Sequence, residues 1–331
     1  MKCYFSIFIL LQSWSIWSQV GGERAFESLR LSMDPLTVVS SGSIISNTSK
    51  STLAVRSNPA IQHYVDKGAV AFGQEFGYAS IGRTGLAATL LPTSKWKLTV
   101  GVNATNFGDF DRFDETGTAE GSFQARDLDL YMSTAKKVGP FAIGITASYL
   151  SSQIDNYSAS GLIADIGGIY ELPNKNLNLA MVIKNIGGIL SDYTGASSSM
   201  PIELQFGFTA EPEHMPVRFN VSYTDALSKI ESPEDGEEQR LKVLSDFVSH
   251  LNTAIELLIS KSFVFNLGYN HQIRRELGLE NNNGLTGFGW GFTLNTKKFN
   301  FELTRSHDHR AGGTTFISLA SNIDYFFNKK I

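Results

Sequence analysis

The chain has 331 residues and a formal net charge of −4, and its 28 lysines and arginines are scattered rather than clustered. This argues against nucleic acid as a partner, because nucleic-acid-binding proteins present dense basic patches. Hydrophobic residues make up 42% of the chain and the mean hydropathy is −0.08, values that a soluble protein would also have. A transmembrane β-barrel gives the same average, since its polar lumen-facing side chains offset its lipid-facing ones.

Residues 1–18 have the features of a secretory signal peptide. Lys2 provides a short basic start, Phe5 to Leu11 form an apolar core, and Ser18-Gln19 offers a cleavage point. The apolar core is too short to span a membrane. The single cysteine, Cys3, leaves with the signal. The exported chain therefore has no disulfide, and we expect barrel closure to stabilise it instead.

Residues 19–68 show no strong periodicity and contain a serine-rich stretch between Ser40 and Ser51. Their apolar residues are too many for a disordered tail. These residues are Phe26, Leu29, Leu31, Leu36, Val38, Val39, Ile44 and Ile45. A barrel of about 14 strands has a lumen too wide for its own side chains to fill. We therefore expect this segment to fold into the lumen as a plug; the alternative is a periplasmic tail.

The rest of the chain alternates apolar and polar residues with a period of two, as in the segment from Trp96 to Thr105. This pattern is typical of strands with one apolar and one polar face. Each segment has roughly the ten residues that a tilted strand needs to cross a bilayer. The candidate strands are 69–79, 83–91, 96–107, 126–137, 140–151, 160–171, 177–186, 202–211, 216–225, 250–260, 262–273, 285–296, 298–307 and 313–327.

We predict an all-β fold, a transmembrane antiparallel β-barrel of about 14 strands over residues 69–327, followed by a tail at 328–331. A soluble β-sandwich or a lipocalin-like barrel would show similar alternation. The connections favour the membrane barrel, because short and long ones alternate along the chain. The short turns lie at 92–95, 136–139, 172–175, 211–214 and 297–298, and the long connections at 108–125, 152–159, 187–201, 226–249, 274–284 and 308–312.

Bacterial barrels keep short turns in the periplasm and long loops outside. We therefore expect an outer-membrane location with extracellular long loops, and both termini in the periplasm because the strand number is even.

The sequence contains no convincing catalytic motif, and we expect no enzyme activity and no cofactor. His307-Asp308-His309 with Arg310 has the spacing that places two imidazoles on one face of a strand, as zinc ligands would lie. Because no third ligand can be named, we interpret it as a polar rim and expect no metal. A Ser–His–Asp hydrolase remains an alternative, although no Gly-x-Ser-x-Gly motif is present.

Two loop patches combine aromatic residues with arginine, residue types that protein interfaces enrich. One runs from Gly108 to Gly117 and the other from Arg274 to Leu277. Salt bridging within each loop is the alternative explanation. The candidate partner-binding residues are Phe110, Asp111, Arg112, Phe113, Asp114, Tyr157, Tyr193, Arg274, Arg275, His309 and Arg310.

An ordered set of short motifs along the mature chain resembles the PorQ family of the type IX secretion system of Bacteroidetes. The motifs are Gly21-Gly22-Glu23 with Phe26 and Leu29, Asn58-Pro59-Ala60, Asp111 to Gly117, Gln153 to Ser158, Gly161-Leu162, Asp165-Ile166-Gly167, Lys184 to Gly187, Leu267 to Asn270, Arg274 to Leu277, Gly284 to Gly291 and His309 to Gly313. The Asn-Pro-Ala turn and the segment before the barrel are also similar to the wider FadL-type transporter class.

The resemblance implies a FadL-like barrel with a plug and a non-enzymatic role in the surface attachment complex. The partners it implies are a PorZ-like surface protein, a PorU-like sortase and a PorV-like barrel, besides outer-membrane lipid. Two other functions stay open: transport of a hydrophobic small molecule and a simple diffusion pore. The residues that we assign to the lumen are polar, which weakens the transporter; they are Lys97, Thr99, Asn103, Asn266, Asn270, Thr293 and Asn295.

Overall fold

The computed structural model describes residues 26–31, 33–93, 96–193, 199–227, 247–277, 284–309 and 312–327. The predicted signal peptide, the tail at 328–331, the Gly21-Gly22-Glu23 motif and Arg310 lie outside this description.

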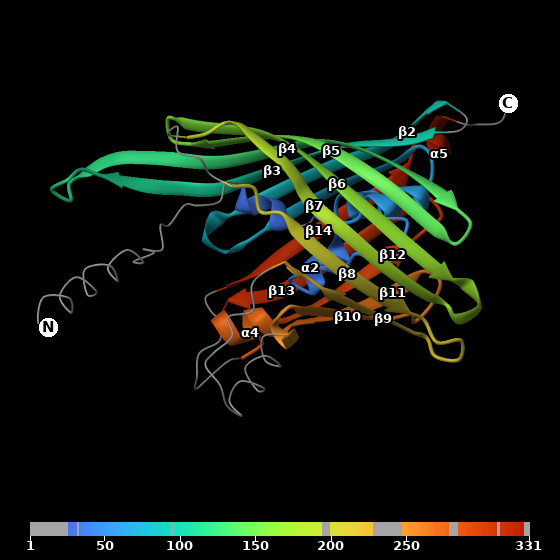
Figure 1. Ribbon diagram of the computed structural model, residues 1–331. Coiled ribbons are helices and arrows are strands. Elements are labelled where there is room, and N and C mark those ends of the chain that lie inside the picture. Colours follow the sequence, from blue (N-terminus) through green and yellow to red (C-terminus); the bar gives the residue numbers. More distant parts are fainter. Residues whose placement is uncertain are drawn as a thin grey trace, which may run out of the picture.

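The described chain forms a closed antiparallel β-barrel of 14 strands, as predicted (Figure 1). Each strand pairs with its neighbours in the sequence, and β14 pairs with β1 to close the sheet. The strands are β1 (Ala69–Phe76), β2 (Gly82–Thr93), β3 (Trp96–Phe113), β4 (Ala119–Val138), β5 (Phe141–Ile154), β6 (Tyr157–Leu172), β7 (Leu177–Ser191), β8 (Glu203–Ala210), β9 (Val217–Tyr223), β10 (Leu251–Leu257), β11 (Phe263–Asn270), β12 (Phe288–Asn295), β13 (Phe299–His309) and β14 (Gly312–Asn322). Each one overlaps a predicted strand.

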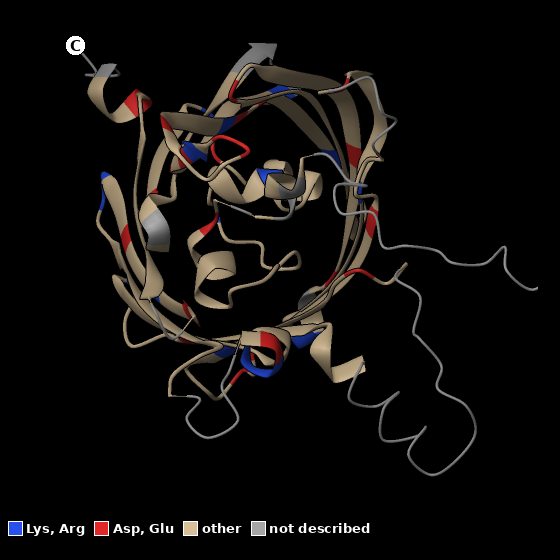
Figure 2. Ribbon diagram, turned by 90° about the vertical axis from the view of Figure 1, so that its left-hand side faces the viewer, with Lys and Arg blue, Asp and Glu red and all other residues tan. Residues whose placement is uncertain are grey.

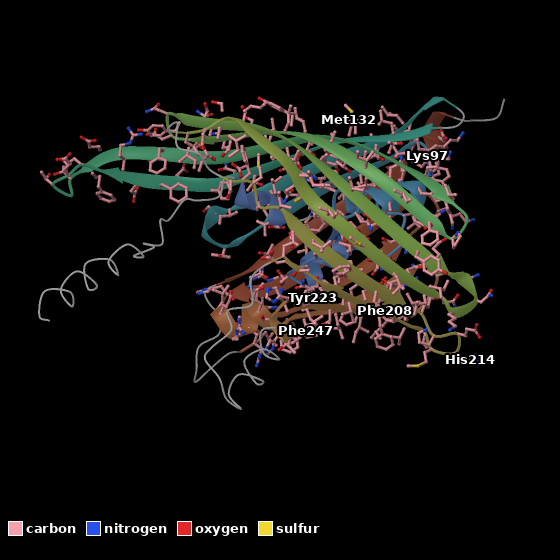
Figure 3. The ribbon with its side chains drawn as sticks, in the orientation of Figure 1. Lys97, Met132, Phe208, His214, Tyr223 and Phe247 are labelled. Carbon is pink, nitrogen blue, oxygen red and sulfur yellow. The ribbon has the colours of Figure 1, made fainter. Side chains whose placement is uncertain are left out.

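The two-residue period places apolar side chains on the outside of the barrel, as β5 shows. Phe141, Ile143 and Ile145 are exposed on its outer face, while Ala142 and Thr146, at the alternate positions, are fully buried. Successive side chains of a strand point to opposite faces, so the sequence alternation becomes an inside–outside division. Side chains such as that of Met132, which is 55% exposed, cover the outer surface (Figure 3).

Two ends of the barrel differ in their connections. At one end, here called the short-turn end, the connections at 94–95, 139–140, 173–176, 211–216, 258–262 and 296–298 are all short. Tyr78–Ser80 (η4) lies in a connection at the opposite end, and Pro173–Lys175 (η5) and Asp324–Phe327 (α5) lie at the short-turn end. No helix of the described residues is long and apolar enough to cross a membrane.

The long connection predicted at 108–125 is wrong. β3 continues to Phe113 and β4 begins at Ala119, so the two strands form a hairpin that projects beyond the barrel (Figure 1). The ladder continues because Phe110 lies opposite Phe123, with ring centroids 5.4 Å apart. The carboxylate of Asp114 closes the turn by accepting hydrogen bonds from the backbone N–H groups of Thr116 and Thr118, both at 2.8 Å. Residues 107–124 are here called the ribbon.

Other long connections are also shorter than predicted. β5 and β6 are joined by a two-residue turn at 155–156 instead of a loop at 152–159. Asp155 adopts a left-handed conformation with φ 54°, which lets the ladder run to the tip. β7 continues to Ser191, and the loop predicted at 274–284 begins with a helix, α4 (His271–Leu277). Long connections among the described strands are therefore confined to β7–β8, β9–β10 and β11–β12.

The segment before β1 runs inside the barrel (Figure 2). It contains four short helices: η1 (Glu27–Arg30), α2 (Pro35–Val39), η2 (Leu53–Arg56) and η3 (Pro59–His63). Residues 26–65 are here called the inner segment. Of the apolar residues expected to fold inward, Leu31 is 53% exposed, while the others, such as Val39 and Ile45, are buried. Closure of the lumen by this segment stays a prediction.

Strand glycines let the inner segment approach the wall. A Cβ atom on Gly144 of β5 would lie 2.4 Å from the backbone carbon of Pro59, whereas one on the outward Gly168 of β6 would have its nearest neighbour at 3.9 Å. The lumen side therefore requires glycine where η3 lies against β5, and the lipid side does not.

We predict that Gly144→Val lowers the unfolding free energy by about 1–3 kcal/mol, because the side chain would overpack against η3. Gly168→Val is the matched control and should leave stability within about 0.5 kcal/mol. Thermal unfolding and protease cleavage within residues 50–65 measure the effect. Equal stability of the two variants would show that η3 does not lie against β5.

Candidate functional site: the lumen and its inner segment

An ion cluster joins the inner segment to the barrel wall. Arg56 at the end of η2 forms ion pairs with Asp129 of β4, at 2.7 Å between Nε and Oδ2, and with Asp165 of β6. Arg56 is 5% exposed and Asp165 is 1% exposed. The second oxygen of Asp165 accepts a hydrogen bond from the backbone N–H of Asn185 at 2.6 Å. Separating such a pair would leave a buried charge uncompensated, which costs about 3–5 kcal/mol.

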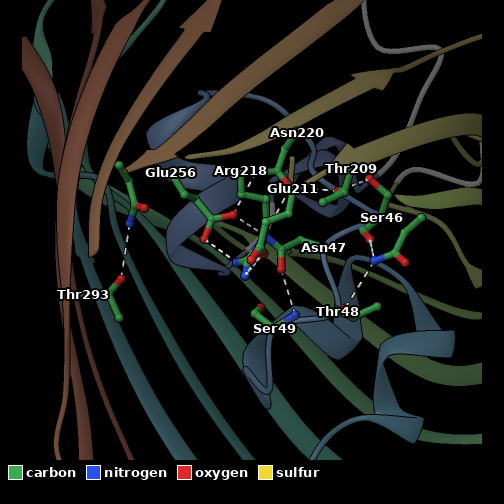
Figure 4. A network of polar contacts seen from close by, with 12 residues as sticks. Ser46, Asn47, Thr48, Ser49, Thr209, Glu211, Arg218, Asn220, Glu256 and Thr293 are labelled. Atoms are coloured by element: carbon green, nitrogen blue, oxygen red, sulfur yellow. Dashed lines mark hydrogen bonds and ion pairs between the residues drawn. The ribbon is translucent and has the colours of Figure 1, made fainter. Parts of the chain in front are cut away.

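A second polar network holds the inner segment against the opposite wall (Figure 4). The side-chain amide of Asn47 donates hydrogen bonds to Glu256 of β10 at 2.6 Å and to Asn220 of β9 at 3.2 Å. Arg218 bridges Glu256 and Glu211, with N–O distances of 2.9 and 2.8 Å. The inner segment is therefore fixed to both sides of the barrel by charged or amide groups.

These contacts confirm the lumen assignments that they test. The Lys97 Nζ atom donates to the backbone oxygen of Val65 at 2.7 Å, and Asn270 donates to that of Ser41 at 2.7 Å. Thr99 forms a hydrogen bond with Thr89 across the β2–β3 pair at 2.8 Å.

An apolar cluster divides the lumen into two cavities. Met33 and Leu53 of the inner segment pack against Tyr131 and Phe316 of the wall, all with exposures of 4% or less. On the ribbon side of this cluster lies a cavity of about 30 Å³, lined by Phe26, Leu29, Leu31, Met33, Arg56 and Asp129 among others. That volume holds one or two water molecules.

The other cavity is much larger, about 690 Å³, and lies toward the short-turn end beside β9 to β14. It is here called the chamber. Its lining is mixed: Glu256, Asn266, Thr293 and Glu302 are polar, whereas Leu53, Leu258, Val264 and Phe299 are among the apolar residues. Asp34 of the inner segment also lines it, so two consecutive residues, Met33 and Asp34, face the two cavities.

Asp34 is the N-cap of α2. Its carboxylate accepts a hydrogen bond from the backbone N–H of Thr37 at 3.2 Å, and Pro35 follows it at the first helical position. Burial raises the pKa of Asp34 to about 6, and the hydrogen bond from Thr37 opposes this shift only in part. Near neutral pH the carboxylate is thus charged in a site that disfavours charge.

The structure does not bring the predicted partner-binding residues into one surface. Phe110, Asp111, Arg112, Phe113 and Asp114 lie on the ribbon, whereas Arg274 and Arg275 lie on α4 between β11 and β12. The strand order places these two groups on opposite sides of the barrel. Arg274 lies over the ring of Phe288 at 5.4 Å, and the Arg275–Glu276 pair is loose at 3.9 Å.

The remaining candidates divide between surface and interior. Tyr157 is 54% exposed at the start of β6. Tyr193 is half-buried, because its hydroxyl donates to Ser152 at 2.6 Å and its ring packs beside the cluster of Phe26 and Leu29. His309 stacks on Tyr78 at 6.0 Å. The Tyr193 side chain therefore packs toward the interior of the barrel rather than toward an outer surface.

The polar contacts of these candidates bear on the alternative explanations. Arg112 is paired with Asp155 of the neighbouring hairpin, so its ion pair joins two connections and does not lie within its own loop. The carboxylate of Asp308 accepts hydrogen bonds from Ser41 at 2.6 Å and Ser306 at 2.9 Å. No group of three or more potential metal-binding His, Cys, Asp or Glu side chains occurs in the part of the chain that the structure describes.

Sequence reasoning missed the ion cluster of Arg56, Asp129 and Asp165. A signal was available, because Asp129 and Asp165 occupy inward positions of two predicted strands and would need a buried cation. The partner arginine lies in a segment without periodicity, so its position could not be assigned.

Comparison with known proteins finds likeness at the level of structure. The toluene transporter TodX of Pseudomonas putida matches with a TM-score of 0.53 at 10% identity, covering 85% of this chain and 96% of TodX. The toluene transporter TbuX of Ralstonia pickettii matches with a TM-score of 0.51 at 9% identity, covering 92% of this chain and 100% of TbuX. No model of a protein family and no curated protein sequence matches the chain.

The likeness to TodX and TbuX extends over most of the chain and shows that they share its β-barrel fold. A Pseudomonas aeruginosa FadL homologue aligns less well, with a TM-score of 0.45 at 9% identity. At such identities the shared feature is the fold, and function has to be argued from the site.

We predict that burial of Asp34 makes the barrel less stable as the pH rises. Its pKa in the folded chain, about 6, lies above the ordinary 3.8, so the folded state binds the proton more tightly than the unfolded state does. The stabilisation is complete at low pH and is lost as the pH rises through about 6.

Asp34→Asn keeps an N-cap acceptor and removes the charge. Its melting temperature should exceed that of the wild type near neutral pH and converge with it below about pH 4. Melting curves of both proteins across this pH range test whether the difference in melting temperature grows as the pH rises. A difference between them that does not change with pH would contradict the assignment.

Proposed function

We propose that the chain is an outer-membrane channel for a small hydrophobic or amphipathic molecule, gated by residues 26–34 of the inner segment. The outer face supports the membrane-spanning part of this proposal. Exposed Leu, Ile, Phe and Met side chains cover the strands, whereas the inward positions carry Thr, Ser, Asn and acidic residues. A barrel in a bilayer requires this division. The proposed role is non-enzymatic.

The observation that carries the gate is the thin partition between the two cavities. Met33 faces the ribbon-side cavity and Asp34 faces the chamber. Displacing one turn of the inner segment around Met33 would join the two cavities. In the described residues before Met33, Ser28 donates a hydrogen bond to Asp127 of β4. The ion cluster at Arg56 holds the remainder of the inner segment in place.

The proposed substrate class follows from the lining and from the neighbours. TodX and TbuX are toluene transporters, and they share this fold. Phe26, Leu29 and Leu31 supply apolar surface to the ribbon-side cavity, beside charged wall residues such as Arg83 and Asp127, and Leu31 is 53% exposed. The chamber is lined by both polar and apolar residues, so a solute that passed through it would contact both kinds of surface before it reached the short-turn end. A small solute with limited apolar surface suits both compartments.

We predict that Met33→Ala opens the partition. Removing the Met33 side chain beyond Cβ would join the cavities, and toluene flux into vesicles containing the protein should rise several-fold. Met132→Ala is the matched control, because Met132 is 55% exposed on the outer face. Flux that stays at the wild-type level in Met33→Ala would argue against the gate. A rise in both variants would indicate general loosening of the barrel instead.

A second function, anchoring of a surface partner, is favoured by the ribbon. Asp109 to Phe113 of β3 and Ala119 to Gln124 of β4 form strand pairs only with each other, and Arg112 and Gln124 also contact Asp155 of the β5–β6 hairpin. The ribbon therefore projects past that hairpin while it is held to it at its base. Phe113 is 60% exposed and Phe110 is 42% exposed. Exposed aromatic side chains on a rigid projection are typical of interface centres. The resemblance to the PorQ family suggests a PorZ-like partner, acting with a PorU-like sortase and a PorV-like barrel.

We predict that replacing Phe110, Arg112 and Phe113 together by Ala releases such a partner without unfolding the barrel. The partner should leave the membrane fraction, while the melting temperature of the barrel stays within a few degrees of wild type. Arg274→Ala with Arg275→Ala, on the opposite side of the barrel, is the control. Retention of the partner by the triple variant would remove the ribbon from consideration as the docking site.

A further inference from the structure

Positive charge is distributed unequally between the two ends of the barrel. Of the ten lysines in the described part of the chain, nine lie at the short-turn end, and the tenth, Lys184, is buried in the wall. The nine are Lys50, Lys67, Lys97, Lys136, Lys137, Lys175, Lys261, Lys297 and Lys298. Of the exposed or half-buried arginines, Arg112, Arg126, Arg274, Arg275 and Arg305 lie at the ribbon end. The half-buried Arg218 lies near the short-turn end, where it is paired with Glu211 and Glu256.

Four of the nine lysines are already engaged. Lys50, Lys67 and Lys137 form ion pairs with Asp66, Asp324 and Glu171, and Lys97 donates to backbone oxygens of the inner segment. The other five are exposed, and no ion pair with a described residue engages them. They are Lys136, Lys175, Lys261, Lys297 and Lys298, here called the lysine collar.

The collar is spread over several sectors of the barrel rather than forming one patch, and three of its members, Lys261, Lys297 and Lys298, also line the mouth of the chamber. Its members come from the β4–β5, β6–β7, β10–β11 and β12–β13 connections or the strand residues beside them. Strand order spreads these connections around much of the circumference. A single globular partner would contact one sector, whereas a flat bilayer leaflet contacts every sector at the same height.

Aromatic residues lie at the same level as the collar. Phe141 and Tyr170 are in contact with ring centroids 4.6 Å apart, and Phe299 lies 5.9 Å from Phe326. The Nζ atom of Lys298 lies 6.0 Å from the centroid of the Phe326 ring. Aromatic rings beside lysines are typical of the headgroup level of a membrane, where the ring is half in hydrocarbon and the ammonium group reaches phosphate.

We propose that the lysine collar binds the phosphate groups of anionic glycerophospholipids in the leaflet at the short-turn end. The projecting ribbon carries Asp109, Asp111, Asp114, Glu115 and Glu120 against the single basic residue Arg112, so its net charge is negative and such a leaflet would repel it. The collar thereby sets the orientation of the barrel: short turns toward the phospholipid leaflet and ribbon away from it. This inference rests on the membrane-spanning part of the proposed function and not on the gate.

The test is insertion of the folded protein into vesicles of phosphatidylcholine alone, or of phosphatidylcholine with an equal amount of phosphatidylglycerol. The melting temperature, read from heat-dependent gel mobility, should be about 5 °C higher in the mixed vesicles. Replacing the five collar lysines by Gln should remove more than half of that difference. Gln in place of the five ribbon-end arginines is the matched control and should leave the difference unchanged. High salt should abolish it, because exposed charges are screened.

Three results would overturn the proposal: equal melting temperatures of the wild type in both lipids, a full difference in the collar variant, or the same stabilisation by inorganic phosphate in phosphatidylcholine vesicles. A larger effect with lipid A in place of phosphatidylglycerol would also overturn it, since the phosphate source would then be the opposite leaflet. Failure to insert into either vesicle would instead contradict the membrane-spanning function, so the two failures are distinguishable.

Discussion

The structure depends on one constraint. A closed barrel of 14 strands has a wide lumen, and the polar side chains that point into it need hydrogen-bond or ion-pair partners. The inner segment meets this requirement by bringing polar groups to the wall. Arg56 sits between Asp129 and Asp165, and Asn47 reaches Glu256. Because each contact joins a non-periodic segment to a different strand, the segment and the barrel wall specify one another, and neither would keep its conformation alone.

The inner segment fills the lumen unevenly: it contacts the wall closely on one side and leaves a cavity on the other. η3 lies against β4, β5 and β6, where Gly144 and Gly167 allow backbone contact. Beside β9 to β14 the segment stands away from the wall and leaves the chamber. The cluster around Met33 is therefore the only apolar partition that we identify between the two cavities of the described lumen. A small movement there changes the connectivity of the lumen, whereas the ion cluster at Arg56 keeps the remainder fixed.

The strands were predictable from the sequence because a two-residue period is a local signal. Every strand has an apolar outer face and a polar inner face, so the same period recurs in each of them. The ribbon was not, since Asp109 to Gly117 has the composition of a loop; only the pairing of Phe110 with Phe123 reveals a ladder. The ion cluster was also missed. Its residues are far apart in the chain, and Arg56 lies in a segment whose path is set by the wall rather than by its own periodicity.

The two proposed functions meet on one strand. β4 carries Phe123 in the ribbon and, four residues later, Asp127, which accepts a hydrogen bond from Ser28 of the gate. Two residues further on, Asp129 holds Arg56. A partner that displaced β4 at the ribbon would therefore act on the strand that contacts both Ser28 and Arg56. Under the two proposals, docking at the ribbon and movement of residues 26–34 would be coupled through β4, and the buried ion pair of Asp129 with Arg56 would limit the size of that movement.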